Sequence, residues 1–331
     1  MAIKFIPKFG TSLIAGGGLG VSGFVAYNNT VPKNIQEALE REGIPFIKSI
    51  SDENARNRAY KAVYIDNEKT IKSDISNVTT SADEAYSKIE KWCNDKLSQK
   101  YSGSALNKDR EKIINYCSDQ VPRTVEGRLR RIEDQKWIKD ETNGKDEAYK
   151  AIFAIYRYDQ KFLDLINGDE NTKHTQATEA ETGYTRLQTW CEKNLKSEVA
   201  LVADENLYSY VFWWCKKLDY ETTVEEKIKH DYSGWKKASS EWTSIKGIWQ
   251  HTSEVFSVVD TSKSSSPDGK DISDDKYKNW CDATLKKNIY DKDVYQKEYL
   301  IAKSVCADKE IQYKLGEKKS LKEAIEAVKA K

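Results

Sequence analysis

Apolar residues recur along this 331-residue chain at the three- and four-residue spacing that places them on one face of a helix. The clearest cases surround three Trp-Cys pairs, where an apolar residue stands four positions before and four positions after the cysteine. The three sets are Ile89, Cys93 and Leu97; Leu187, Cys191 and Leu195; and Tyr277, Cys281 and Leu285. One apolar face of this kind predicts a helix around each pair.

The Trp-Cys pairs belong to longer segments that recur. A second cysteine follows the first at 24, 24 and 25 residues, and successive first cysteines are 98 and 90 residues apart. Upstream, "AYKAVY" from Ala59 resembles "AYKAIF" from Ala148, with a looser "GWKKAS" from Gly234. Downstream, "TVEGRL" from Thr124 matches "TVEEKI" from Thr223. Such self-similarity predicts duplicated structural modules, of which the third is the most divergent.

Each module is predicted to contain four helices, A to D. The expected ranges are 56–73, 146–167 and 235–257 for A; 82–99, 178–197 and 273–288 for B; 107–119, 204–218 and 293–307 for C; and 123–139, 222–231 and 309–330 for D. The chain is therefore expected to be all-α. Residues 31–55 are expected to be a spacer that carries one short helix, followed by helical-bundle modules at 56–139, 140–231 and 232–331. Most of the length variation lies in the polar loops between helices A and B.

Residues 10–27 contain no charged side chain and follow Lys4 and Lys8. As a helix, eighteen residues would rise about 27 Å, close to a hydrocarbon core of about 30 Å. We therefore expect residues 1–30 to be a single-pass signal-anchor. Positive charge on the short leading side predicts that the N-terminus stays in the cytoplasm and that the bulk of the chain is extracellular.

Small residues at Ser12, Gly16 and Gly20 form a stripe that would pack one such membrane helix against another. Two other interpretations of the same segment remain: a signal peptide that is cleaved, and a glycine-rich loop of a soluble protein.

The charge of the chain excludes one class of partner. Lys and Arg total 54 and Asp and Glu total 53, for a formal net charge of +1. Binding to nucleic acid depends on neutralising phosphates with an excess of basic side chains, so no nucleic-acid partner is expected. Aromatic residues make up 11% of the chain, which indicates folded cores rather than a disordered polymer.

In an antiparallel hairpin of helices B and C, the two cysteines of a module would reach similar heights on facing helices. We therefore predict three disulfide bonds, one within each module. Each bond would close a loop and so stabilise the folded protein by roughly 3 to 4 kcal/mol. The predicted pairs are Cys93 with Cys117, Cys191 with Cys215, and Cys281 with Cys306. An even number of cysteines fits an exported protein.

Other roles for the cysteines stay open. Reduced, buried cysteines acting as small apolar residues are the main alternative. A metal site is disfavoured because no C-x-x-C occurs, and a catalytic thiolate because none of the three histidines lies near a cysteine in the sequence. Trp92, Trp190 and Trp280 are expected to be structural aromatics beside the sulfur atoms rather than ligand cages.

Searches for reaction chemistry find no motif of a hydrolase, a zinc protease, a nucleotide-binding loop or a calcium loop. No enzyme activity, catalytic residue, metal or cofactor is therefore expected. The basic run "RLRRIEDQK" from Arg128 is interpreted as a solvated helix face.

The Lys-flanked, glycine-rich N-terminal segment and the recurring W-C, Y-C and T-V-E motifs resemble the lineage-specific paralogous proteins of hemotropic mycoplasmas. The resemblance covers the N-terminus and the first two modules well and the third weakly. It implies an AT-rich, wall-less bacterium living on red cells, in which such proteins are exposed, diversifying antigens. It supplies no catalytic or binding residues.

The expected function is that of a membrane-anchored surface protein whose helical modules display variable polar loops in a host-interaction or antigenic role. A host surface protein is then the expected partner, besides the membrane at residues 10–27. The alternative is an intracellular or membrane-associated helical scaffold for partner proteins, with its cysteines reduced.

Overall fold

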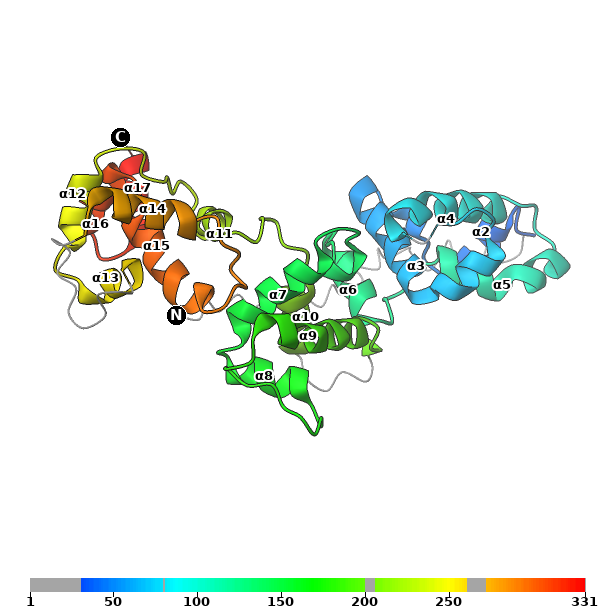
Figure 1. Ribbon diagram of the computed structural model, residues 1–331. Coiled ribbons are helices and arrows are strands. Elements are labelled where there is room, and N and C mark those ends of the chain that lie inside the picture. Colours follow the sequence, from blue (N-terminus) through cyan, green and yellow to red (C-terminus); the bar gives the residue numbers. More distant parts are fainter. Residues whose placement is uncertain (1–30, 80, 200–205, 261–271, 331) are drawn as a thin grey trace. The chain divides into compact units, whose positions relative to one another are not determined.

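The computed structural model describes residues 31–79, 81–199, 206–260 and 272–330 (Figure 1). Within these ranges the regular secondary structure is helical, and β-contacts occur as isolated bridges rather than as strands. The all-α class predicted from the sequence is confirmed. The chain divides into two compact units, Met1–Pro122 and Arg123–Lys331. The buried apolar residues form one core in the first unit and two in the second, which we call the first, second and third cores.

The first core extends from Ile35 to Cys117. Its elements are α2 (Ile35–Arg41), the short 3-10 helix η1 (Ile47–Ser49), α3 (Glu53–Asp74), α4 (Ala82–Leu97) and α5 (Gly103–Cys117). Polar residues start these helices: Asp52 accepts a hydrogen bond from the amide of Ala55 at the start of α3, and Ser102 accepts one from Ala105 at the start of α5. Such N-caps satisfy amides that the helix itself leaves unpaired.

The second core repeats this plan with one helix more. Its elements are α6 (Val125–Ile132), the 3-10 helix η2 (Ile138–Asp140), α7 (Lys145–Tyr156), α8 (Gln160–Asn167), α9 (Ala180–Leu195) and α10 (Asn206–Cys215). Helix α9 packs closely on α7 and contributes the buried Leu187 and Leu195. The apolar positions that predicted a helix from the sequence are thus the ones that the core buries.

The third core includes a short π-helix and two additional helices. Its elements are α11 (Val224–Asp231), α12 (Trp242–Trp249), α13 (Ser253–Val259), α14 (Asp274–Thr284), the π-helix η6 (Val294–Tyr299), α15 (Leu300–Val305), α16 (Lys309–Glu317) and α17 (Leu321–Lys329). Helices α16 and α17 pack on the core through Ile311 and Ile325. The single helix expected over 309–330 is therefore two helices.

A short backbone pairing recurs at the start of each core. The residue before the opening helix pairs with the stretch that follows the Trp-Cys helix. The three bridges are Asn34 with Lys100, Thr124 with Glu198, and Thr223 with Asn288. In each case the first amide of the opening helix donates to that stretch: Ile35 to the carbonyl of Gln99, Val125 to Ser197 and Val224 to Lys287, at 3.0, 3.0 and 2.9 Å. The pairing both fixes the helix and satisfies an otherwise unpaired amide.

A second bridge joins the segment after the opening helix to the residue that follows the second cysteine. The pairs are Phe46 with Ser118, Trp137 with Lys216, and Lys237 with Ala307. Each opening helix is therefore held near both of its ends by the two helices that carry the cysteines of the same core.

Two helices that the sequence placed at the end of a module pack with the helices that follow them in the chain. Helices expected at 123–139 and 222–231 as the last of their modules instead open the second and third cores. The short helix expected within residues 31–55 is α2, and the 3-10 helix η1 follows it. The compact units divide after Pro122 rather than after residue 139. Val125 is fully buried in the second core, which explains the difference. The spacing of the Trp-Cys pairs gives the period of a repeat, whereas its starting point depends on which core buries the intervening helix.

The long helix expected before each Trp-Cys helix is interrupted. In α3 the interruption is at Asn67, where φ is −131° and ψ is 20°. In the second core α7 and α8 are separate, and Asp159 restarts the chain as the N-cap of α8. In the third core α12 and α13 are separate, and residues 235–241 are not helical. The expected single helices at 146–167 and 235–257 are thus each replaced by two shorter ones.

Candidate functional site

All six cysteines are joined in three disulfide bonds. The bonds are Cys93–Cys117, Cys191–Cys215 and Cys281–Cys306, with Cα–Cα distances of 5.5, 5.6 and 5.6 Å. The pairing is the one that the helical hairpin predicts. Every cysteine has an exposed fraction of 0%, so each bond lies inside its core.

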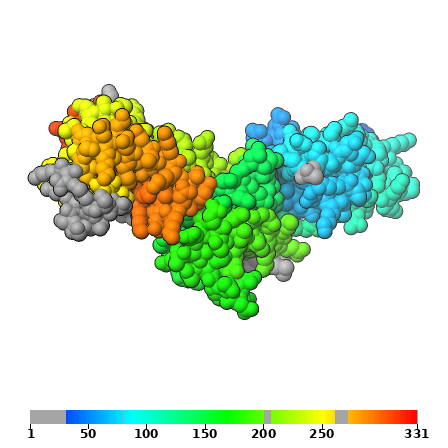
Figure 2. Space-filling view, viewed as in Figure 1, coloured from blue at the N-terminus to red at the C-terminus, as the bar shows by residue number. Residues whose placement is uncertain are grey.

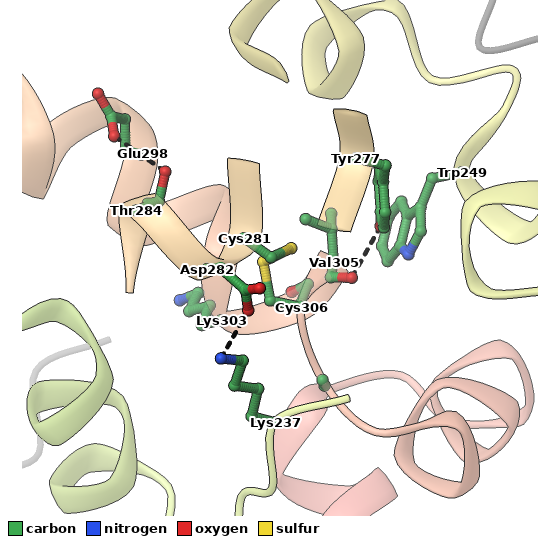
Figure 3. The surroundings of a disulfide bond; sticks show 12 residues. Lys237, Trp249, Tyr277, Cys281, Asp282, Thr284, Glu298, Lys303, Val305 and Cys306 are labelled. Carbon is green, nitrogen blue, oxygen red and sulfur yellow. Dashed lines mark hydrogen bonds and ion pairs between the residues drawn. A yellow bond between two sulfur atoms is a disulfide. The ribbon is translucent and has the colours of Figure 1, made fainter. Parts of the chain in front are cut away.

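Figure 3 shows how the third disulfide is positioned. Cys281 lies on α14, and Cys306 follows the last turn of α15. One helical turn before Cys281, the hydroxyl of Tyr277 donates to the carbonyl of Val305 at 2.7 Å. Burial raises the pKa of Tyr277, so the phenol keeps the proton that it donates. The residues around the sulfur atoms make packing contacts and hydrogen bonds. The role of this disulfide is therefore structural.

The tryptophans beside the first cysteines pack on the residue beside the second cysteine in two cores. Trp190 is buried, and its ring centroid lies 5.1 Å from that of Trp214. Trp92 is half-buried and meets Tyr116 edge to face at 5.5 Å. Trp280 is also half-buried and packs on the third core. These aromatic contacts widen the apolar surroundings of the disulfides.

A buried cluster of charges lies where the sequence indicated a solvated face. Glu126 and Arg130 on α6 have exposed fractions of 2% and 4%. The carboxylate of Glu126 forms ion pairs with Arg130 at 3.3 Å and with Lys139 at 3.2 Å. Arg130 also forms an ion pair with Asp140 at 2.6 Å. Burial raises the pKa of Glu126, and the two cations oppose that shift. The interpretation of this basic run as a solvated face is wrong for Arg130, because the cluster ties α6 to η2.

The loop between α8 and α9, residues 168–179, has a defined conformation. Asn167 is 4% exposed; its side-chain NH2 donates to the carbonyl of His174 at 2.8 Å, and its oxygen accepts the amide of His174 at 2.8 Å. Arg186 donates to that same oxygen at 3.0 Å and to the carbonyl of Thr172 at 2.5 Å. Arg157, 6% exposed, donates to the carbonyl of Thr178 at 2.7 Å. Backbone groups of the loop are therefore satisfied by side chains from the helices.

Sequence reasoning expected a polar loop here and missed the residues that shape it. The one local signal is the Asn167–Gly168 dipeptide, a frequent turn sequence. Gly168 has φ of 48° and follows the end of α8. The positions of Arg157 and Arg186 depend on packing between helices that are distant in sequence, which a local pattern does not contain.

The expected membrane anchor, residues 10–27 with Ser12, Gly16 and Gly20, lies outside the described residues. Among the residues that the structure does describe, every helix is too short or too polar to cross a bilayer. The same residues contain no group of three or more His, Cys, Asp or Glu side chains arranged to hold a metal ion.

Fold and disulfides together define an all-α protein with three internally bonded helix pairs. Comparison with known proteins finds no matching family model, no matching curated protein and no matching solved structure.

Proposed function

We propose that this chain is a surface protein of an oxidising compartment, built from three disulfide-bonded helical modules that present loops to a partner outside the cell. The observation that carries the proposal is the set of three buried disulfides, with no cysteine left free. Structural disulfides of this kind persist in exported proteins and are rare in the cytosol of most organisms.

The recurring bridges support three modules with starting points at the opening helices. In this division the modules begin near Asn34, Thr124 and Thr223, and each ends after its second cysteine. Every module then contains one opening helix, one interrupted helix and one disulfide-bonded pair of helices. The third module carries α16 and α17 in addition.

The loops before the Trp-Cys helices are the surfaces proposed for partner contact. They comprise the segments between the flanking helices, residues 75–81, 168–179 and 260–273, which are seven, twelve and fourteen residues long. Of these, residues 80 and 261–271 lie outside the part of the chain that the structure describes. The paired helices, in contrast, keep the two cysteines 24, 24 and 25 residues apart. Length change therefore concentrates where binding and recognition residues are commonly carried in proteins.

Anchoring through residues 10–27 completes the proposal. The uncharged run and the preceding Lys4 and Lys8 support it, and the resemblance to the paralogous proteins of hemotropic mycoplasmas agrees with surface display. A host surface protein is the proposed partner.

The oxidation state of the protein in its native cells tests the compartment. Unreduced protein would be alkylated with N-ethylmaleimide and its peptides examined by mass spectrometry. We expect no labelled cysteine before reduction and six labelled cysteines after treatment with dithiothreitol. A cytosolic protein with known free thiols, labelled in the same lysate, is the control. Six labelled cysteines without reduction would overturn the proposal and favour the intracellular scaffold.

Protease treatment of intact cells tests exposure. We expect trypsin to remove the disulfide-bonded region from the cell surface while a cytosolic marker stays intact. Full protection of this region on intact cells, with digestion after lysis, would contradict surface display.

A further inference from the structure

The loop at 168–179 is an addition that the helical frame does not require. In the first core, α3 connects to α4 through residues 75–81, and the bridges and the disulfide form as in the second core. The second core uses five residues more at the same place. Since the frame closes without them, the longer loop has a role other than connecting helices.

The side chains that hold this loop make its shape largely pre-formed. Asn167 and Arg157 are both more than nine-tenths buried, and their polar groups bond to the loop backbone at His174 and Thr178. Burying polar side chains is unfavourable unless each finds a partner, so these bonds fix the loop in one arrangement. A pre-formed wall loses less conformational entropy when a ligand binds.

Beneath the loop lies a hollow of about 420 Å³ that is open to solvent. Small-molecule sites in proteins occupy roughly 300 to 1,000 Å³. Leu163 and Ala177 give it an apolar portion. Its polar side chains come from α8 and from the loop: Gln160, Asp164, Asn167, Lys173, His174, Thr175 and Gln176.

The chemistry of this lining selects a class of ligand. Asp164 supplies only acceptors, the ammonium of Lys173 supplies only donors, and the two glutamine amides supply both. The amide of Gln160 donates to one oxygen of Asp164 at 2.8 Å and Lys173 donates to the carbonyl of Gly168 at 2.8 Å, which orients these groups around the hollow. The imidazole of His174 is partly buried, and burial together with nearby Arg186 lowers its pKa, which favours the neutral form of the ring. An anion would be repelled by the carboxylate of Asp164, and a cation would be repelled by the ammonium of Lys173. A neutral ligand with several hydroxyl groups, each both donor and acceptor, matches a lining of mixed donors and acceptors.

We propose that the hollow under residues 168–179 is a binding site for a neutral sugar unit. Its hydroxyls bond to Asp164, the glutamine amides and Thr175, and its apolar face lies against Leu163 and Ala177. The inference names the kind of group that one loop of the proposed surface protein contacts, and it rests on that proposal for its biological setting.

The full chain, purified with its disulfides intact, would be examined by saturation-transfer NMR. The probes are D-glucose, D-galactose, D-mannose and N-acetyl-D-glucosamine, with inorganic phosphate and choline as charged competitors. We expect transfer to at least one sugar, weakened at least about 5-fold by Asp164→Asn and by Gln176→Ala, and unaffected by phosphate or choline. Asp169→Asn, in the same loop but outside the hollow, is the matched control and should bind as the wild type does.

Absence of transfer to all four sugars would overturn the sugar site, as would equal losses in Asp164→Asn and Asp169→Asn. Competition by phosphate or choline would overturn it too, because the site would then recognise charge. These measurements use purified protein, so they are independent of where the protein resides. Surface display is tested separately, by the alkylation and protease experiments on cells.

Discussion

Gly183 is the position on α9 where a single missing side chain allows two helices to meet. A methyl group built there would lie 2.1 Å from the ring of Phe153, which is fully buried on α7. Glycine within a helix is unfavourable for the helix alone, by roughly 0.5 to 1 kcal/mol relative to alanine. Here the close packing of α7 on α9 outweighs that local preference.

We expect Gly183→Ala to destabilise the second core by about 1 to 3 kcal/mol, because the added methyl group would overlap the buried ring of Phe153, which already packs against Phe162 and His174. Urea unfolding followed by tryptophan fluorescence measures the change. Gly247→Ala on α12 is the matched control, since no atom lies within 4 Å of the added methyl group, and it should be neutral or stabilising. Equal stability of Gly183→Ala and wild type would show that the two helices can separate at no cost.

Asp74 gives the first core a dependence on pH. Lys112 donates to its carboxylate at 2.6 Å and Tyr116 at 2.8 Å, and the hydrogen bond from Lys112 is the main reason that its pKa is lowered. A carboxylate with a depressed folded pKa stabilises above its unfolded pKa, about 3.9, and this contribution disappears as pH falls through the folded value.

Asp74→Asn should therefore lower the free energy of unfolding most at neutral pH, and the difference from wild type should shrink below about pH 4. Urea titrations across the acid range measure it. Asp95→Asn, an exposed carboxylate on α4, is the control. A difference that stays constant from pH 7 down to about pH 2 would mean that the lowered pKa of Asp74 does not contribute.

Single residues divide into those that sequence patterns specify and those that packing specifies. The pairing of Cys191 with Cys215 could be predicted from the sequence, because the rise per residue of two antiparallel helices places the two cysteines at the same level along the hairpin. The buried pair of Glu126 and Arg130 could not, because whether a charged residue of a helix faces solvent depends on what lies beside it. Asn167 belongs to the second kind, and the proposed sugar site depends on it.

At the scale of elements, the disulfide-bonded helix pair is the unit that recurs. In the second core it consists of α9 and α10, and the bond joins Cys191, one turn before the end of α9, to the last residue of α10. Helix α10 has ten residues, and isolated helices of that length are marginal in water. Packing and the covalent bond together stabilise it.

Replacing both Cys191 and Cys215 by alanine should reduce the stability of the second core by roughly 3 kcal/mol or more. Changing both residues avoids a lone thiol. Hydrogen exchange followed by mass spectrometry measures the loss core by core. The expected signature is faster exchange in α9 and α10, with α4 and α5 unchanged as the internal control. Equal acceleration in α4 and α5 would contradict independent stabilisation of the first unit.

Element types could be predicted well, and element limits less well. The apolar periodicity predicted α4 and α9 within two residues at each end. The interruptions at Asn67 and between α7 and α8 were missed, because both halves of such a helix keep the same apolar face. Apolar periodicity shows which face of a helix is buried. An interrupted helix keeps the same periodicity, so the interruption leaves no signal in the pattern.

At the scale of the whole molecule, the second and third cores belong to one compact unit. Gln296 from η6 reaches α7, where its amide donates to the carbonyl of Ala154 at 3.0 Å and its oxygen accepts Arg157 at 2.9 Å. Figure 2 shows the atoms of this third-core segment, in orange, against the green atoms of the second core. Arg157 also holds the 168–179 loop, so this contact connects the third core to that loop.

We expect Gln296→Ala to reduce the stability of the contact between the two cores by about 1 to 2 kcal/mol, since Arg157 and the carbonyl of Ala154 each lose a partner. Exchange rates should rise at the end of α7 and in the 168–179 loop. Lys297→Ala is the matched control, because this neighbouring side chain is 63% exposed. Unchanged exchange at both places in Gln296→Ala would show that the cores are joined by other contacts.

The two bridges that flank each opening helix have a mechanical consequence. A pulling force on a tethered chain would enter a module at its opening helix and leave just past its second cysteine, where the second bridge lies. The 23 residues between Cys93 and Cys117, whose sequence separation is 24, are bypassed, because the load crosses the sulfur–sulfur bond instead. A fully extended chain spans up to about 3.5 Å per residue, so each bond shortens the maximum length of the stretched chain by roughly 80 Å. The reduced form would therefore extend further than the oxidised form, by roughly 240 Å over the three bonds.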